Sequence, residues 1–478
     1  MARKWWTLVA VCTGVFMLLL DITIVNVALP DIQHAFHASL SELQWTIDAY
    51  ALTLAAFLLT AGSLADLFGR RLLFAIGLTI FTAGSLACGV AGSSGLLVAS
   101  RAFQGVGGAI MFSTSLALIA QAFQARDRGV AFAVLGATTG VSVAVGPVLG
   151  GLLTSGISWR WIFFVNIPVG IVALLVTLRM VDESRNPFAK RPDVLGFLTF
   201  STGLAALTFG LIRSEPDGWG SATVVGSLCA AAVLIAAFLT VELAQRNPMF
   251  DMSLLRKPTF SGGLLAALAI NGSLFSLLTY LILYFQQTLG LSAAQTGVRF
   301  LPLTVAIFFA SAIAGRLSEH VPARALLMPG FALVGSGLLL MRGISVDSDW
   351  SHLLPGMIVA GVGAGFVNVP LAATAIGIVE PARAGMASGI NTTFRQVGTA
   401  TGVAALGAIF ATHLHVAART ELRGGVVDGL NEILLIGALV AFVAAVATLL
   451  LVRQSDFVDP SEHVALPGGE PELATSAA

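Results

Sequence analysis

The sequence predicts an all-α membrane protein with fourteen transmembrane helices, in two six-helix bundles with two further helices inserted between them. Three observations support this fold class. The 478 residues are 56% hydrophobic and only 10% charged, whereas about a quarter of the residues in a soluble domain are charged. Fourteen apolar runs are each long enough to cross a hydrocarbon core of about 30 Å. A short charged segment also occurs twice, at equivalent places in the two halves of the chain.

The apolar runs fall into three groups along the chain. Six come first, at about 6–29, 44–64, 73–91, 96–118, 130–153 and 161–180. Two follow at about 194–213 and 221–243, and six more lie at about 259–285, 295–315, 325–342, 352–375, 386–410 and 431–452. We expect a first bundle over 1–180, two extra central helices with cytoplasmic linkers over 181–258, a second bundle over 259–453 and a disordered cytoplasmic tail over 454–478.

The basic residues favour one orientation in the membrane. With the amino terminus inside, the cytoplasmic segments carry 17 of the 25 lysines and arginines and the opposite face carries five. This bias follows the positive-inside rule, and an even number of spans puts both termini on one side. No clear small-residue cleavage site ends the first apolar run, so we keep it as a span. We therefore expect both termini in the cytoplasm.

The composition argues against several function classes. Cys12, Cys88 and Cys229 each lie alone in an apolar run, so they predict neither a metal site nor a disulfide framework. No glycine precedes a lysine, so a phosphate-binding loop for ATP is missing. No nucleophile and base form a catalytic constellation, and the zero net charge gives no sign of a nucleic-acid partner. We expect no enzyme activity, no cofactor and no metal.

The segment 62–71, GSLADLFGRR, is the densest in charge, and we call it the gating loop. Its charges cannot lie in hydrocarbon, so it must turn in water or headgroups between the second and third spans. Two glycines permit a tight reversal, and an aspartate can cap a helix or pair with an arginine. It could act as a conformational latch, or its arginines could merely hold the turn in the cytoplasm. The candidate gating residues are Gly62, Asp66, Gly69, Arg70 and Arg71.

A degraded copy of this loop, GRLSEHVPAR, lies at 315–324. Gly315, Leu317, Glu319 and Arg324 take the places of Gly62, Leu64, Asp66 and Arg71, and Pro322 replaces a glycine. The copy indicates duplicated halves, which suit alternating access around a central site.

Asp21 lies inside the first apolar run, about 10 Å from its outer end at 1.5 Å per residue. The proton affinity of such a carboxylate depends on its solvation and on nearby cations, so it can load and release a proton between two states. No histidine lies in the middle of a span, which leaves carboxylates as the proton carriers. The alternative is an aspartate that is merely satisfied by Thr23 or Asn26.

Two further charges lie at a similar depth. Asp48 stands about four residues into the second run, where it could either couple to proton movement or simply snorkel to water. Arg101 stands about five residues below the outer end of the fourth run. A buried arginine without an anion is unfavourable by several kcal/mol, so we expect a carboxylate or a substrate to pair with it.

The fifth run carries the sequence GPVLGG, with Gly146, Pro147, Gly150 and Gly151. Small residues four positions apart let helices pack closely, and a proline loosens the helix locally. From the residues alone, this pattern indicates helix packing.

Together, these motifs resemble the major facilitator superfamily of secondary transporters. The gating loop is similar to its signature loop, except that Leu67 stands where the family usually has a basic residue. RAFQGVGGA, with Gln104, resembles its fourth-span motif, whose arginine is implicated in proton coupling. GPVLGG resembles its antiporter motif, which is associated with exporters. With the intact first-span signature at 21–30, the chain resembles the fourteen-span drug:proton antiporter family of bacterial multidrug and antibiotic exporters.

The second half contains two cations within spans and no acid in the middle of a span. Arg299 lies near the outer end of the tenth run, and Arg395 lies near the middle of the thirteenth. They could bond backbone carbonyls or face a cavity that holds an anionic or zwitterionic substrate. The candidate substrate contacts are Gln104, Asn271, Arg299 and Arg395.

We predict a monomeric secondary transporter in the bacterial inner membrane that exports amphipathic drugs or related compounds by proton antiport. Asp21, Asp48 and Arg101 would carry the proton coupling. The alternatives are a proton-coupled importer or a narrow-specificity metabolite exporter, and, in another class, a membrane scaffold or sensor. The antiporter motif argues against an importer, and the cost of acids within spans argues against a scaffold.

Overall fold

The computed structural model describes residues 3–123, 125–185, 192–245, 248, 250–318, 320–379, 384–416 and 422–457. The regular elements of these residues are all helices. Thirteen helical segments are long and apolar enough to cross a membrane, and a fourteenth, bent by 41°, runs over residues 134–156. The predicted fold class is confirmed, and the described residues contain the predicted fourteen spans if the bent pair is counted as one span. Most of the helices extend a few residues beyond the apolar runs, because their ends are polar.

The first bundle consists of α1 (Arg3–Phe36), α2 (Leu40–Phe68), α3 (Arg70–Gly89), α4 (Ser94–Ala122), α5 (Ala125–Gly156), α6 (Trp161–Phe164) and α7 (Asn166–Met180). Ser39 and Glu42 form a capping box that starts α2, and the Ser93 side chain caps α4. The sixth span is interrupted between α6 and α7, which the apolar pattern did not predict. Helix α4 packs against α2 and α3, and α1 packs against α5 and α7.

The second bundle starts with one long span, α10 (Pro258–Ile270), η2 (Asn271–Phe275), α11 (Ser276–Leu283) and η3 (Tyr284–Thr288), in which η2 and η3 are π-helical. It continues with α12 (Ala293–Arg299), α13 (Leu301–Leu317), α14 (Ala323–Met341), α15 (Leu354–Gly377), α16 (Ala384–Val416) and α17 (Leu422–Leu451). Helix α15 packs against α13 and α14, and α16 packs against α10 and α17. Two predicted features, Glu319 of the degraded loop and residues 458–478 of the tail, lie outside the described residues.

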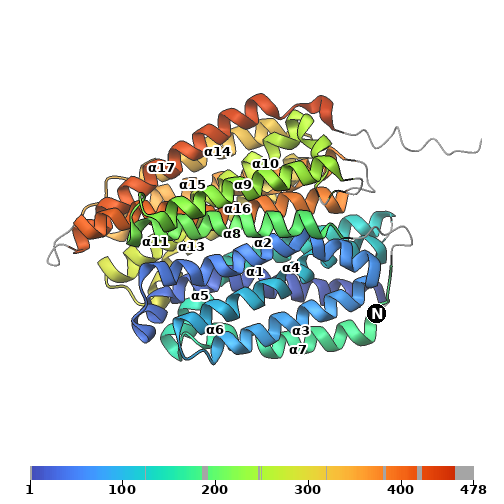
Figure 1. Cartoon of the computed structure of the whole chain (residues 1–478), viewed down its shortest axis with the longest axis horizontal. Coiled ribbons are helices and arrows are strands. Elements are labelled where there is room, and N and C mark those ends of the chain that lie inside the picture. The colour runs from blue at the N-terminus through green and yellow to red at the C-terminus, as the bar shows by residue number, and fades with distance from the viewer. Residues whose placement is uncertain are drawn as a thin grey trace, which may run out of the picture.

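Helices α8 (Val194–Asp217) and α9 (Ala222–Ala244) pack against each other, and α8 also contacts α2 and α16. The pair thus lies across the seam between the two bundles (Figure 1). Asp193 holds the start of α8, because its carboxylate accepts from the Gly196 N–H at 2.7 Å and from Gln245 at 2.8 Å. Helix α9 exposes most of its apolar surface, as expected for a lipid-facing helix.

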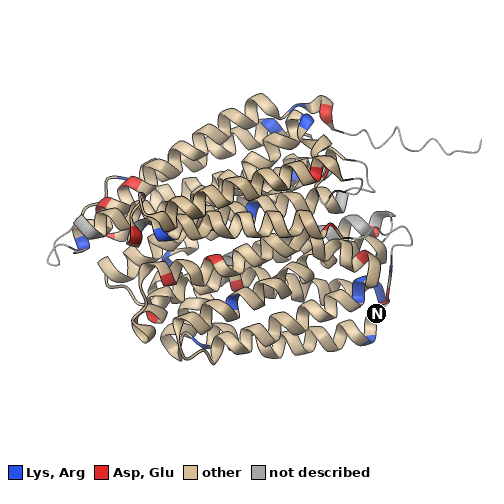
Figure 2. Ribbon diagram, viewed as in Figure 1, with Lys and Arg blue, Asp and Glu red and all other residues tan. Residues whose placement is uncertain are grey.

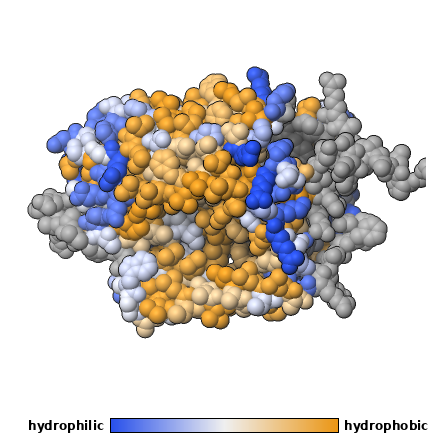
Figure 3. Space-filling view, turned by 90° about the horizontal axis from the view of Figure 1, so that it is seen from above, coloured by the Kyte–Doolittle hydropathy of each residue, from blue (hydrophilic) through white to orange (hydrophobic). Residues whose placement is uncertain are grey.

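The distribution of polarity fits a membrane protein. Charged residues gather toward the two ends of the molecule, with few between them (Figure 2). In the space-filling view, an apolar belt lies between two hydrophilic ends (Figure 3). The N-terminus and the end of α17 lie on the same side (Figure 1). We call this the termini side and the opposite one the far side.

The bundles are joined by hydrogen bonds on the far side. Gln44 of α2 donates to the Tyr280 hydroxyl at 3.2 Å and to the Val403 carbonyl at 3.4 Å. The other contacts run from Gln286 to the Val27 carbonyl (2.8 Å), from Gln287 to Gln33 (2.7 Å) and from the Ala294 N–H to Ser155 (3.0 Å). These hydrogen bonds connect the first bundle with the second. They hold the two bundles together on the far side.

Candidate functional site: a buried ion pair in the first bundle

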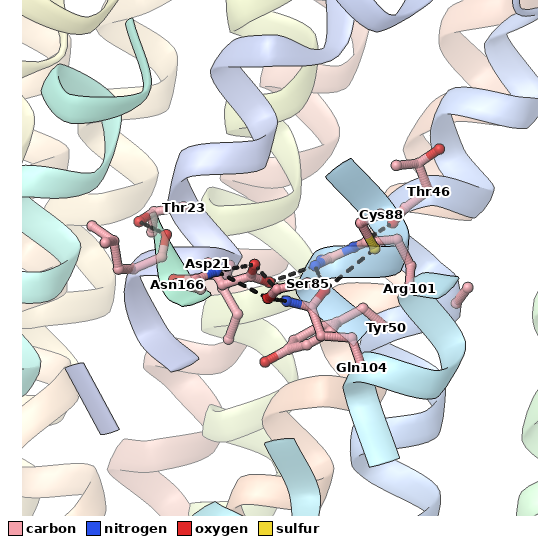
Figure 4. Close-up of polar contacts among 12 residues, drawn as sticks. Asp21, Thr23, Thr46, Tyr50, Ser85, Cys88, Arg101, Gln104 and Asn166 are labelled. Carbon is pink, nitrogen blue, oxygen red and sulfur yellow. Dashed lines mark hydrogen bonds and ion pairs between the residues drawn. The ribbon is translucent and has the colours of Figure 1, made fainter. Parts of the chain in front are cut away.

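Asp21 lies in the middle of the first bundle and is fully buried. Its carboxylate forms an ion pair with the Arg101 guanidinium of α4. One carboxylate oxygen also accepts from the side-chain amides of Gln104 at 2.9 Å and Asn166 at 3.3 Å (Figure 4). Four helices, α1, α3, α4 and α7, contribute to this cluster, which also includes Ser85. We call Asp21, Ser85, Arg101, Gln104 and Asn166 the Asp21 network.

Arg101 has neutral partners besides Asp21. Its Nε donates to the Thr46 carbonyl at 3.2 Å, and its Nη1 donates to Gln104 Oε1 at 2.7 Å. The guanidinium also lies 4.2 Å from the centroid of the Tyr50 ring, where a cation–π attraction acts. These contacts matter because Arg101 is only 2% exposed and cannot exchange its partners for bulk water.

Ser85 of α3 links the two amides of the network. Its hydroxyl accepts from Gln104 Nε2 at 2.7 Å and from Asn166 Nδ2 at 3.2 Å. Close packing makes this possible, since a Cβ at Gly84 would lie 2.8 Å from the Gln104 Cα, and one at Gly105 would lie 2.6 Å from the Tyr50 carbonyl. These two glycines therefore let α3 and α2 approach α4 directly beside the ion pair.

The structure separates the alternatives for Asp21. Thr23 and Asn26 do not satisfy its carboxylate, because they donate to carbonyls of their own helix: Thr23 to Leu20 at 3.0 Å and Asn26 to Ile22 at 3.5 Å. The predicted pairing of Arg101 with a carboxylate is present, and Asp21 supplies it. Gln104 does not have the free amide expected of a substrate contact, because the network occupies both ends of its side chain.

Asp48 lies on α2 and is also fully buried. Both carboxylate oxygens are buried, and neither has a hydrogen-bond partner. Of the two alternatives for Asp48, snorkelling to water does not occur in this structure, because neighbouring helices cover the side chain on the far side of the membrane midpoint. It does not pair with Arg101 either, whose carboxylate partner is Asp21.

The antiporter motif lies where α5 contacts α1 of its own bundle and α12 of the second bundle. A Cβ at Gly146 would lie 1.9 Å from Thr23 Oγ1, and one at Gly150 would lie 2.9 Å from the Ile24 carbonyl, so both glycines contact α1 next to Asp21. Gly151 packs against the second bundle in the same way, since a Cβ there would lie 2.4 Å from the Ala293 carbonyl. Across this contact, a Cβ at Gly297 would lie 2.2 Å from the Pro147 carbonyl. The motif thus provides bare backbone for two close helix contacts.

Gly146→Ala should displace α1 from α5 and disturb Asp21, two residues before Thr23. We expect a loss of stability of about 1–3 kcal/mol, the usual range for overpacking, together with a large loss of transport. Gly136→Ala is the matched control, since nothing lies within 4 Å of a Cβ at Gly136 of the same helix. Thermal unfolding and transport of the two purified variants check this, and equal behaviour of both variants would contradict it.

The gating loop is anchored by an acid that the sequence reasoning missed. Glu183, in the segment after α7, accepts from the N–H groups of Arg71 at 3.0 Å and Leu72 at 3.1 Å, so its carboxylate caps α3. Gly69 turns the chain with φ +122°, and a Cβ there would lie 2.7 Å from the Glu183 carboxylate. Asp66 pairs with Arg70 at 2.9 Å, as one of the predicted options. Asp66 therefore pairs within the loop, and Glu183 ties the loop to α7.

Glu183→Ala should loosen the gating loop, because two N–H groups at the start of α3 lose their acceptor. We expect a loss of about 1 kcal/mol in stability, as for other helix caps. Asp182→Ala is the control: its carboxylate pairs with Arg3 on the open surface, where such pairs contribute little. Thermal melts of the purified proteins test this. A loss for Asp182→Ala as large as that for Glu183→Ala would show that the cap has no special role.

The remaining candidate substrate contacts differ in their surroundings. Asn271 lies in η2 and donates to the Ala267 carbonyl at 3.2 Å. Arg299 donates to the Gln295 carbonyl at 3.3 Å, and its guanidinium lies 5.4 Å from the Trp350 ring, so its contacts are local. Arg395 donates to the side-chain oxygen of Asn368 at 3.0 Å. The structure brings none of the three into the Asp21 network. Within the described residues, no three His, Cys, Asp or Glu side chains are grouped as for a metal.

Comparison with known proteins supplies the family. A sequence profile of the Major Facilitator Superfamily matches residues 11–403 and 264–475. The chain belongs to the Major Facilitator Superfamily. This confirms the resemblance of the chain to the superfamily.

Two bacterial resistance proteins are similar to this chain over most of their length. The chain is 36% identical over 423 residues to the multidrug resistance protein Stp of Mycobacterium tuberculosis, which covers 88% of this chain and 79% of Stp. It is also 36% identical over 456 residues to the puromycin resistance protein pur8 of Streptomyces alboniger, which covers 94% of this chain and 90% of pur8. The crystal structure of the human organic anion transporter MFSD10 (TETRAN) shares the fold, with a TM-score of 0.64 over 94% of this chain and 100% of that one at 16% identity.

Proposed function

We propose that this superfamily member is a proton-driven exporter of amphipathic organic compounds, including drugs or antibiotics, in the inner membrane of a bacterium. The observation that carries the proposal is the fully buried ion pair between Asp21 and Arg101 inside the membrane-spanning part. The names of the relatives, which concern multidrug and puromycin resistance, support the substrate class. The antiporter motif beside Asp21 supports export.

The Asp21 network supports proton coupling because it provides partners for the Arg101 cation both when Asp21 is charged and when Asp21 is protonated. A proton on Asp21 neutralises the carboxylate and removes the ion pair. Arg101 then keeps the Thr46 carbonyl and the Tyr50 ring, so the cation is not left without partners. The two charge states favour different spacings of α1 and α4, and movement of these helices links the proton to the conformation.

Asp48 is the second carboxylate of this coupling. Its oxygens have no partner, and a buried charge without a partner is unfavourable, so a bound proton relieves it. Asp48 lies one helical turn from Gln44, which joins the two bundles on the far side. A change of charge at Asp48 is therefore placed to affect that contact.

The two bundles would act as the rocking units of alternating access, with boundaries at 1–180 and 259–453 and with the inserted pair bridging them. With the termini in the cytoplasm, the far-side hydrogen bonds would close the extracellular entrance in this state. The gating loop, held by Glu183, would lie at the cytoplasmic entrance. Export then requires the far side to open while the cytoplasmic side closes. We further propose that the protein acts as a monomer.

Dye transport in everted membrane vesicles tests the direction of this function. Everted vesicles that are energised by respiration should accumulate ethidium, and a protonophore should abolish the accumulation. Vesicles without the protein are the control. Accumulation by right-side-out vesicles but not by everted ones would favour an importer. If ethidium moves in neither, a panel of anionic and neutral dyes decides between narrow specificity and no transport.

A further inference from the structure

Arg395 is a cation inside the second bundle that forms no ion pair with an acid of the described residues. It lies on α16, within the membrane-spanning stretch 386–414. Its Nη2 donates to the side-chain oxygen of Asn368 on α15 at 3.0 Å and to the Asn368 carbonyl at 3.5 Å. Both partners are neutral. Arg101 in the first bundle, by contrast, is paired with Asp21.

The remaining donors of Arg395 have no hydrogen-bond acceptor among the described residues. A guanidinium carries five N–H groups, and Asn368 takes only those of Nη2. The Nε atoms of Arg71 and Arg299 are buried without a hydrogen-bond partner, but no nitrogen of Arg395 is. The free N–H groups of Arg395 are therefore not fully covered by the protein, and the side chain is half-buried.

Asn391 adds a second unsatisfied donor beside Arg395. It lies four residues earlier on α16, hence on the same face of the helix. Asn391 is only 4% exposed, and its Nδ2 is buried without a hydrogen-bond acceptor. On one helix face, the Asn391 amide thus lacks any acceptor from the protein, and the Arg395 guanidinium has acceptors for Nη2 alone. An unsatisfied buried donor is costly, so this arrangement favours a ligand that accepts hydrogen bonds.

The described acids of the second bundle lie near the ends of its spans and do not pair with Arg395. Within its described part, Asp347 and Asp349 precede α15, Asp428 and Glu432 lie in the first turns of α17, and Asp456 follows α17. None lies in the middle of a span. A lone cation in a membrane interior needs a counter-charge, and here a ligand can bring it.

We propose that Arg395, Asn368 and Asn391 bind the anionic group of an amphipathic organic substrate, such as a carboxylate, sulfonate or phenolate. The planar guanidinium suits a two-point contact with such oxygens. The inference rests on the proposed function, since it names the substrate class of the exporter. It extends that function from amphipathic compounds in general to those that carry a negative charge.

Cysteine chemistry at Asn368 tests the electrostatics without any transport. Asn368→Cys is made with Cys12→Ser and Cys229→Ser, while Cys88 stays because it is fully buried. Purified protein is treated with the negative reagent MTSES (methanethiosulfonate ethylsulfonate) and the positive reagent MTSET (its trimethylammonium analogue). The ratio of the MTSES rate to the MTSET rate should fall at least about tenfold on Arg395→Gln and stay within about twofold on Arg395→Lys. An introduced thiol that does not react, or a ratio that ignores Arg395, overturns the proposal.

Two dyes with one carbon skeleton then test the ligand class. The anionic dye 8-anilinonaphthalene-1-sulfonate differs from neutral N-phenyl-1-naphthylamine by its sulfonate. The anionic dye should protect the introduced thiol from MTSES at a concentration at least about tenfold lower than the neutral dye, and Arg395→Gln should remove this difference. Equal protection by both dyes, or equal protection by inorganic sulfate, overturns the assignment to an organic anion. Selective protection without export of either dye in vesicles would instead contradict the proposed function.

Discussion

Asp21→Asn is expected to reduce proton-driven export to the background of vesicles without the protein. The asparagine keeps the shape of the side chain and can still accept a hydrogen bond from Arg101. It can no longer bind and release a proton, so the step that links proton entry to the movement of α1 and α4 is lost. Dye accumulation in everted vesicles with matched protein levels is the measurement.

Asp31→Asn is the matched control for this experiment. Asp31 lies on the same helix, is half-buried and is outside the Asp21 network, so its variant should transport as the unmodified protein does. Normal export by Asp21→Asn would remove Asp21 from the coupling mechanism. An equal loss in both variants would point to a general disturbance of α1.

Arg101→Leu is expected to reduce the stability of the protein strongly. The variant leaves the Asp21 carboxylate in a site with no cation, and removing one partner of a buried ion pair is unfavourable by about 3–5 kcal/mol. The double variant Asp21→Asn with Arg101→Leu removes both charges, so it should recover most of this loss. Both variants should lack proton-coupled export.

Thermal unfolding of the four proteins in one detergent gives the coupling between the two charges as a double-mutant cycle. Additive effects of the two substitutions would contradict a direct ion pair. A recovery of stability without a recovery of transport would separate the structural role of the pair from its role in proton coupling.

Much of the fold could be predicted from the sequence, because lipid imposes long apolar runs and places charges at their ends. The fourteen spans, their three groups and the common side of the termini follow from these runs and from parity. The break between α6 and α7 and the π-helical segments η2 and η3 could not be predicted, because such interruptions leave the mean hydropathy of a span unchanged.

The candidate site was only partly predictable. Asp21 and Arg101 stand out, since a charge within an apolar run is conspicuous. Ser85 and Asn166 do not, because single polar side chains are common in spans and only the packing of α3 and α7 brings these two to Asp21. Glu183 was missed for a similar reason: it lies in a polar linker, where an acid attracts no notice until the fold places it against α3.

The buried charges suggest that the first bundle couples to protons and the second bundle binds the substrate. The first bundle pairs its buried cation with a carboxylate that can take a proton. In the second bundle, the Arg395 cation donates only to the neutral Asn368 among the described residues, and we assign Arg395 to the binding of a substrate anion. The far-side contacts of Gln44 and Tyr280 lie between the two, so a change in one bundle can be transmitted to the other.

The most direct test of the account is proton movement across liposomes that contain the purified protein and a pH-sensitive dye inside. An outward gradient of ethidium, or of the anionic dye if that is the compound exported, should draw protons in the opposite direction in the absence of any imposed pH difference. Liposomes with Asp21→Asn should show no such proton movement. If the unmodified protein moves the dye without protons, or if Asp21→Asn moves protons as well as the unmodified protein, the central role of the Asp21 network is contradicted.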